Sequence, residues 1–169
     1  EDFDGCVDAF HAASAKAGKR QFIVPYFIAS HPGSGVEEMI ELAIYLKKNG
    51  HRPDAVQDFI PSPMDLAATM YHTGLDPLSM EPVKIARSMR DRKMQRALLQ
   101  FFKPENWFEV RRALVESGRE DLIGDHPEAL IAARPPREAV AARRKGAGAA
   151  LGRRSEGYRT RRKGRKKKA

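Results

Sequence analysis

The sequence predicts an α/β fold built around parallel β-strands, and two apolar runs carry this prediction. Residues 21–29 form an almost unbroken run of apolar, β-favouring side chains, and residues 55–60 form a second, shorter one. A helical pattern separates the two runs. A strand that is apolar on both sides is typical of a parallel sheet with both faces covered, and the order strand–helix–strand predicts a right-handed βαβ unit.

The sequence predicts a helix and then the first strand at the start of the chain. Apolar residues recur at helical spacing over residues 3–18, and Gly18 follows as a stop signal, so we expect a helix there. The strand over 21–29 comes next. Pro25 weakens this strand, because proline lacks the amide donor that a sheet ladder needs.

The helix between the two strands has clear boundary signals. Ser34 is a good N-cap, and Glu37 stands three residues later, which is the spacing of a capping box. Apolar residues at helical spacing give this helix a core-facing stripe, and Gly50 is the expected stop. The second strand, residues 55–60, then follows.

Two strands cannot make a sheet that is covered on both faces, so we expect its other strands in a portion that precedes Glu1. The chain also starts without a methionine, and its first methionine is Met39. Together these observations predict that the chain is the C-terminal part of a longer α/β protein.

After the second strand the pattern becomes helical. A short helix over 64–72, a longer one over 84–102 and a third that starts at Pro104 and ends before Gly118 are expected. Beyond about residue 136 the apolar content falls to alanine and few larger side chains. Such a segment buries too little surface to offset its ordering entropy, so we predict a disordered tail.

The charge is divided unevenly along the chain. Residues 134–169 hold 15 Lys and Arg against two acidic residues, whereas residues 1–133 hold 16 against 20. The whole-chain net charge of +9 therefore comes from the tail. We expect the folded part not to bind nucleic acid. For the tail two interpretations are open: weak, non-specific binding of polyanions, or a solvated segment without a partner.

The single cysteine, Cys6, excludes an internal disulfide and a zinc or iron–sulfur site made by this chain alone. The histidines share no metal-ligand spacing. No apolar run reaches the about 20 residues needed to span a bilayer, and the N-terminus lacks signal-peptide features. We therefore expect a cytoplasmic protein that does not interact with membranes and has no metal ligands here.

Five blocks of sequence occur in the order that is typical of one known family. They are residues 24–34 (VPYFIASHPGS), 56–63 (VQDFIPSP), 69–74 (TMYHTG), 95–106 (QRALLQFFKPEN) and 118–124 (GREDLIG). On these blocks, residues 3–136 resemble the uncharacterised YgiQ-like group of radical SAM proteins.

The resemblance implies three parts: the last βα units of a partial TIM-like barrel over 1–75, a helical extension of unknown role over 76–133, and the basic tail over 134–169. It also implies that the intact protein binds a [4Fe-4S] cluster and S-adenosylmethionine. The family's cluster motif, CxxxCxxC, is absent from this chain, and residues 128–132 (EALIA) stand where the family commonly has a Cys and a Pro.

Candidate cofactor-binding residues follow from where ligands bind in barrels of parallel strands, at the carboxyl ends of the strands. They are Ser30, His31, Pro32 and Gly33 after the first strand, and Gln57, Asp58 and Phe59 on the second. The first group could equally form a plain tight turn, and Phe59 could be core filling. Gln57 and Asp58 are adjacent and should point to opposite faces, so one of them should point into the barrel. There it could contact a ligand or equally make a structural hydrogen bond.

Two functions from different classes are open at this point. The resemblance implies a radical SAM enzyme that cleaves S-adenosylmethionine to a 5′-deoxyadenosyl radical acting on an unknown substrate, with no catalytic residue in this chain, which alone should be inactive. The alternative is a non-catalytic helical module whose basic tail binds nucleic acid or another polyanion.

Overall fold

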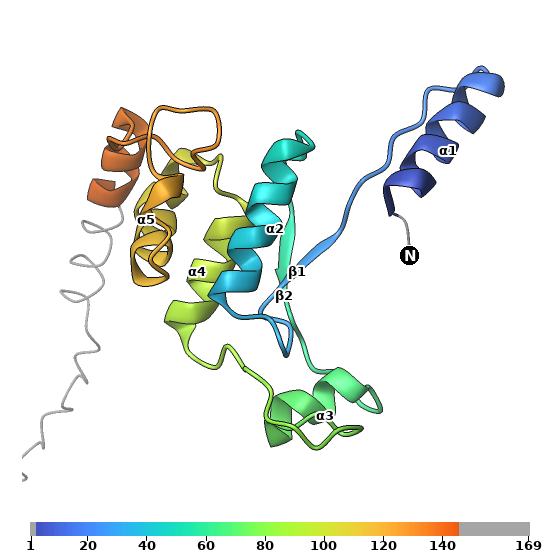
Figure 1. The fold of residues 1–169 in the computed structure, drawn as a ribbon, viewed down its shortest axis with the longest axis vertical. Helices are drawn as coiled ribbons and strands as arrows, with labels where there is room; N and C mark the ends of the chain where they lie inside the picture. Colours follow the sequence, from blue (N-terminus) through green and yellow to red (C-terminus); the bar gives the residue numbers. More distant parts are fainter. Residues whose placement is uncertain (1–2, 146–169) are drawn as a thin grey trace, which may run out of the picture.

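The computed structural model describes residues 3–145 as a mainly helical chain with one small parallel sheet (Figure 1). The helices are α1 (Phe3–Lys16), α2 (Val36–Lys48), α3 (Leu66–Thr73), α4 (Met89–Leu99) and α5 (Trp107–Glu116), with 3-10 turns at Pro104–Asn106 and Glu120–Leu122. A further helix covers 137–145. The strands are β1 (Phe27–Ala29) and β2 (Val56–Asp58).

The two strands pair in parallel, with Phe27 opposite Val56 and Ala29 opposite Asp58. Helix α2 connects them, so the predicted strand–helix–strand unit is confirmed. The Phe59 amide donates to the Ala29 carbonyl at 2.8 Å and extends the pairing beyond β2.

The first strand is much shorter than the predicted 21–29. Residues 21–26 are outside any strand, although their exposure alternates from residue to residue in the way an extended chain does. A strand needs a neighbour for its amides and carbonyls, and β2 reaches only as far as Phe27. The apolar pattern is therefore present without a pairing partner among the described residues.

The cap of α2 lies one residue later than predicted. Gly35 is the N-cap, and its amide donates to the Glu38 carboxylate at 2.8 Å, so Glu38 takes the place expected for Glu37. A Cβ at position 35 would lie 2.8 Å from a Glu38 oxygen. Glycine lets the chain enter the helix beside this carboxylate.

Helix α4 packs against α2, α5 and both strands, and it is the centre of the core. Its Leu98 and Leu99 are fully buried, as are Leu46 of α2 and Leu114 of α5. Burial of one such side chain stabilises a fold by about 1.5–3 kcal/mol. The helix starts at Met89 rather than at 84, because the Ser88 hydroxyl accepts from the Asp91 amide and caps it.

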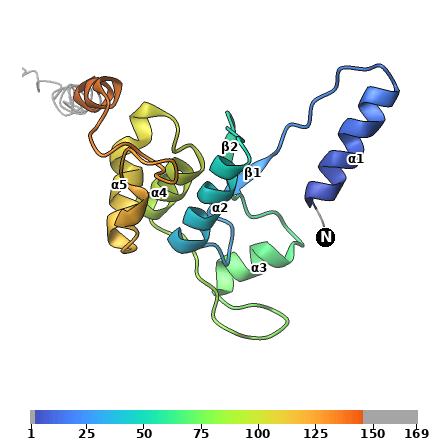
Figure 2. The ribbon, with the colours of Figure 1, turned by 45° about the horizontal axis from the view of Figure 1, so that its top comes forward.

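Residues 137–145 form a helix beside α5 (Figures 1 and 2), so the predicted disorder from about residue 136 is wrong for this segment. Ala139 is 1% exposed and belongs to the core. The Arg143 guanidinium lies 4.4 Å from the centre of the Phe108 ring. One small side chain and one cation–π contact are enough to dock an alanine-rich helix, which a count of large apolar residues misses. Residues 146–169, the rest of the predicted tail, lie outside the described residues.

Helix α1 stands apart from the other elements in both views and joins them through an extended segment (Figures 1 and 2). Its range agrees closely with the predicted helix over 3–18. None of the helices within 3–145 has the length and apolarity required to cross a membrane.

Candidate functional site

The carboxyl ends of β1 and β2 bring two predicted groups together. The turn Ser30–Gly33 follows β1 directly, and Phe59 follows β2. The rings of His31 and Phe59 meet edge to face with their centres 5.1 Å apart. Because β1 and β2 are parallel, their carboxyl ends lie at the same edge of the sheet, and this brings the two groups together.

Gln95 of α4 fixes the turn after β1. This side chain is 1% exposed, and its carbonyl accepts from the Ser30 amide at 2.7 Å while its amide donates to the Ser34 carbonyl at 2.8 Å. Sequence reasoning did not select Gln95. The signal that could have found it is its place among the apolar residues of the helix, near Met94 and Ala97, which are buried. A polar side chain at such a position is expected to have hydrogen-bond partners, because a buried amide needs them.

Ser30 itself has an unusual environment. Its φ of 64° lies in the left-handed region, where residues other than glycine are uncommon. Its hydroxyl oxygen is buried and has no hydrogen-bond partner among residues 3–145. A left-handed residue that is not glycine and an unsatisfied buried hydroxyl both occur at functional sites, where a ligand or a water molecule completes the hydrogen bonding.

Two residues from beyond the strands extend this cluster. The Tyr71 ring of α3 lies 5.9 Å from Phe59, and its hydroxyl accepts from the Arg92 guanidinium of α4 at 2.6 Å. Arg92 also donates to the Ala86 carbonyl at 3.0 Å. Neither Tyr71 nor Arg92 was selected from the sequence, and only their position in the fold brings them to the strand ends.

Gln57 and Asp58 lie on opposite faces of the sheet, as predicted. Gln57 shares one face with Tyr26, whose hydroxyl donates a hydrogen bond to the side-chain oxygen of Gln57. Asp58 lies on the face that α4 covers and forms an ion pair with Arg96. The structure therefore separates Asp58 from Gln57, and the two cannot contact one small ligand from the same side.

The face that carries Gln57 is open and apolar. Phe22, Val24 and Tyr26 are 69%, 86% and 65% exposed, and Ile28 joins them at 40%. These alternate residues share one side of the extended chain, whereas Phe27 and Ala29 pack against the core. One face of this parallel sheet is thus covered by helices, and the other is bare.

Two ionisable groups near these elements have altered pKa values. Hydrogen bonds from the backbone amides of Glu38 and Gly35, together with the nearby Lys84 ammonium, lower the pKa of the Glu38 carboxyl. Hydrogen bonds to Asp121 and Glu41 raise the pKa of Arg119. Both groups stabilise helix ends and loops rather than the strand-end cluster.

The described part of the chain brings no three His, Cys, Asp or Glu side chains together in a way that could hold a metal ion. Cys6 is exposed on α1. The strand-end cluster offers the ring faces of His31, Phe59 and Tyr71 and the hydroxyl of Ser30.

Comparison with known proteins gives one family match and several related sequences. Residues 54–169 match a family described as a domain of unknown function (DUF3362). The chain is 46% identical over 129 residues to a UPF0313 protein of Clostridium botulinum strain 657, with 76% of this chain and 20% of that protein covered.

Two further UPF0313 proteins have similar identities. The protein of Clostridium perfringens strain 13 is 52% identical over 122 residues, which cover 72% of this chain and 18% of that protein. The protein of Rhodopseudomonas palustris is 45% identical over 133 residues, which cover 75% and 20%. The chain thus spans about a fifth of the length of these relatives. No solved structure matches the chain.

Proposed function

The chain belongs to the DUF3362 family, and on that premise we propose that it forms the closing βα units and C-terminal helices of a longer radical SAM enzyme. The similarity to UPF0313 proteins, which are several times longer, supports a larger parent protein. The sequence blocks shared with YgiQ-like radical SAM proteins support the reaction class. The substrate of this enzyme is unidentified.

The observation that carries the proposal is the one-sided cover of the parallel sheet. Helices α2 and α4 lie on the face of Phe27 and Ala29, and the face of Tyr26 and Ile28 is open. In a TIM-like barrel, helices surround the outside and the inward side chains of neighbouring strands fill the interior. The bare apolar face has the composition expected of a barrel interior that other strands complete.

The residues present fit one cofactor and not the other. A [4Fe-4S] cluster needs several thiolates, and the lone, exposed Cys6 cannot provide them, so the cluster would be held by residues outside this chain. S-adenosylmethionine fits better, because the unsatisfied Ser30 hydroxyl, the backbone of the Ser30–Gly33 turn and Gln57 lie at the strand ends or on the open face. Held by residues outside this chain, such a cluster would supply the electron for the reductive cleavage of S-adenosylmethionine.

The residues of this chain would position the ligand and exclude water from it. Gln95 holds the turn, and the rings of His31, Phe59 and Tyr71 form a wall beside it. In this arrangement Asp58 pairs with Arg96 on the face that α4 covers, away from the open face. The helical part thus contributes Tyr71 and Gln95 to a site whose remaining wall comes from the rest of the barrel.

The test uses the whole parent protein and this chain side by side. Both are reconstituted under anaerobic conditions with iron and sulfide, and visible absorption and 5′-deoxyadenosine release from S-adenosylmethionine are measured. We expect a cluster and cleavage with the whole protein and neither with residues 1–169. Absence of a cluster in the reconstituted whole protein would contradict the proposal, as would a stable cluster on this chain alone.

A further inference from the structure

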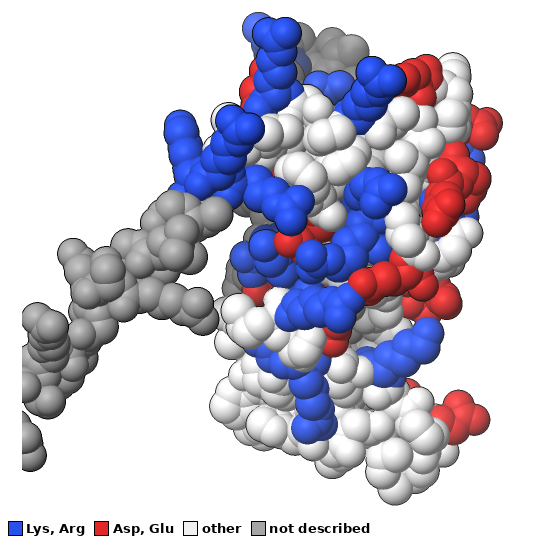
Figure 3. Space-filling view, turned by 90° about the vertical axis from the view of Figure 1, so that its left-hand side faces the viewer, with Lys and Arg blue, Asp and Glu red and all other residues white. Residues whose placement is uncertain are grey.

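Basic side chains gather on the outer face of α4, α5 and the helix over 137–145. These three helices carry ten Lys and Arg against four Asp and Glu. Figure 3 shows Lys and Arg spread widely over this side of the molecule, whereas Asp and Glu gather mainly towards one edge. The folded part therefore has a local charge excess, although its sequence as a whole is mildly acidic.

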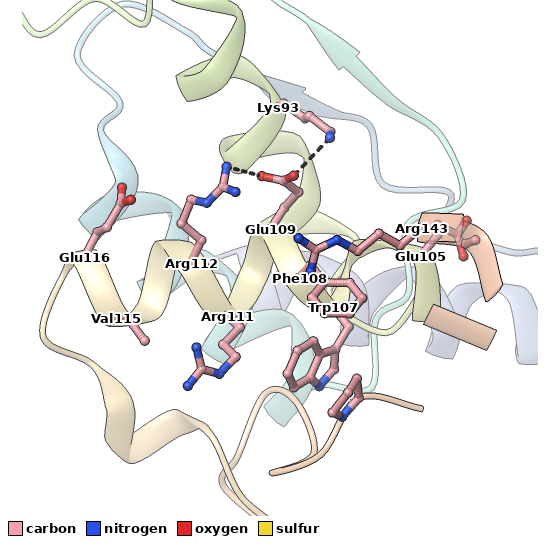
Figure 4. Close-up of a pocket in the computed structure, with 12 residues that line it drawn as sticks. Lys93, Glu105, Trp107, Phe108, Glu109, Arg111, Arg112, Val115, Glu116 and Arg143 are labelled. Carbon is pink, nitrogen blue, oxygen red and sulfur yellow. Dashed lines mark hydrogen bonds and ion pairs between the residues drawn. The ribbon is translucent and has the colours of Figure 1, made fainter. Parts of the chain in front are cut away.

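A groove of about 940 Å³ lies in this region (Figure 4). Within it, Glu109 accepts from Lys93 at 3.0 Å and from Arg112 at 3.2 Å, so these charges balance one another in part. Figure 4 shows Arg111 pointing away from that network. Glu109 and Glu116 of the groove thus pair with Arg90, Lys93 and Arg112, whereas Arg111 and Arg143 have no carboxylate partner among the described residues.

The available cations form a set that we call the basic face: Arg111, Arg137, Arg143, Arg144 and Lys145. Among the residues that the structure describes, none of these five pairs with a carboxylate, and all are exposed. Arg143 lies over the Phe108 ring and lines the groove, and Arg137 and Arg144 line a second hollow of about 480 Å³ on the same helix.

We propose that the basic face binds the phosphate backbone of nucleic acid without reading its sequence. Guanidinium groups bind phosphate oxygens through paired hydrogen bonds, and four of the five cations are arginines. The basic sequence also continues along the chain, because residues 146–169 hold ten Lys and Arg and one acidic residue. A basic face that is followed in the sequence by further basic residues fits an extended polyanion.

Nucleic acid fits this face better than an anionic membrane does. Helices that lie on membranes insert large apolar side chains beside their basic residues. On α5 and the helix over 137–145, Val115 is the one large hydrophobic residue exposed, and Ala139 packs inward. Base stacking is not available either, because Trp107 is buried and Arg143 covers the Phe108 ring.

The basic face is also compatible with a completed barrel. It lies on α5 and the helix over 137–145, while the open sheet face lies on the opposite side of β1 and β2, with α4 between them (Figures 1 and 2). A partner at the open sheet face would leave these cations uncovered. This inference is independent of the proposed radical chemistry, since neither depends on the other.

The experiment compares two triple variants of the full 169-residue chain. R111Q/R137Q/R144Q removes three cations of the basic face, and K16Q/K48Q/R52Q removes three exposed cations elsewhere, with the same change in net charge. Binding of labelled RNA and DNA 20-mers of two sequences, and of phosphatidylserine-containing vesicles, is measured over a series of salt concentrations. Circular dichroism checks that both variants keep the fold.

The wild-type chain is expected to bind all four 20-mers alike. The basic-face variant should bind every one more weakly. The negative slope of log affinity against log salt should become shallower by roughly 2–3, because each lost phosphate contact reduces the magnitude of that slope by about 0.7–0.9. The control variant should keep the wild-type slope. Equal losses in both variants, an unchanged slope in the first, a clear sequence preference or tighter binding to vesicles would each overturn the proposal.

Discussion

Gln95 shows how one buried polar side chain can organise the strand ends. It lies in the apolar stripe of α4, and it bonds to both ends of the turn after β1. Because the turn contains a left-handed Ser30, it needs support from outside its own backbone. The residue that defines this candidate site is therefore distant from it in the sequence.

Replacing Gln95 with leucine should destabilise the protein by about 1–3 kcal/mol, because it leaves the buried Ser30 amide and Ser34 carbonyl without partners. Urea-induced unfolding measures the loss, and hydrogen exchange of the Ser30 amide should become faster. The control is Gln57→Leu, an exposed glutamine on β2, for which a change within about 0.5 kcal/mol is expected. Equal stability of Q95L and wild type would show that the turn after β1 does not depend on the Gln95 side chain.

Glu38 offers a second test at the scale of one residue. Its pKa is lowered by the amide hydrogen bonds at the start of α2, so its contribution to stability is present above the ordinary glutamate pKa. That contribution should disappear as the pH falls through the lowered value. The side chain is half exposed, so the effect should be no more than a few tenths of a kcal/mol.

The Glu38 measurement is a carboxyl titration followed by NMR, together with urea unfolding of E38Q at acidic and neutral pH. The E38Q and wild-type stabilities should differ at neutral pH and converge at low pH. A Glu38 midpoint at or above the ordinary value would contradict the capping role.

At the scale of elements, the helix over 137–145 changes the predicted boundary of the tail. A deletion from residue 137 would remove Ala139 from the core and Arg143 from Phe108, so it would alter the fold as well as the charge. Removal of the tail should therefore begin after Lys145. Disorder was predicted because the segment lacks large apolar residues, and docking through a methyl group and a guanidinium does not need them.

Ala139→Asp should destabilise the docked helix by roughly 2–3 kcal/mol, because it places a carboxylate where the side chain is buried. Ala141→Asp is the matched control, since Ala141 is exposed on the same helix. Thermal unfolding and protease cleavage near residue 136 report the effect. Similar behaviour of the two variants would mean that the helix does not dock in solution.

At the scale of the whole molecule, the open sheet face is the main unsatisfied feature. Phe22, Val24 and Tyr26 expose large apolar surface beside an unpaired strand edge, and such edges tend to associate. The chain on its own should therefore self-associate, and the missing wall of the proposed barrel should suppress this.

The double variant V24K/I28K should shift the isolated chain towards the monomer, because it places charges on the open face. Analytical ultracentrifugation over a range of concentrations measures the shift. The control L78K/M80K changes two residues that are also exposed but lie in the loop after α3. If the wild-type chain stays monomeric at high concentration, the prediction that the open sheet face causes self-association is wrong.

The sequence by itself determined the order of the strand–helix–strand unit and of the helices up to α5, but not the length of the first strand or the helix over 137–145. Boundary residues such as Gly18, Gly50 and Pro104 act over one or two helical turns, so their effects can be predicted from the neighbouring residues in the sequence. The parallel βαβ unit also follows from local periodicity. The five sequence blocks were sufficient to predict a relationship that the UPF0313 similarities support.

Only the tertiary structure decided which distant residues meet. Gln95 and Ser30 are 65 positions apart, and the Arg96–Asp58 pair spans 38. No local pattern specifies such contacts, because they depend on how α4 packs across the sheet. The packing of the helix over 137–145 beside α5 likewise brings Arg143 close to the helix that carries Arg111. A count of charge along the chain does not show this, because it adds residues by their position in the sequence and not by their position in space.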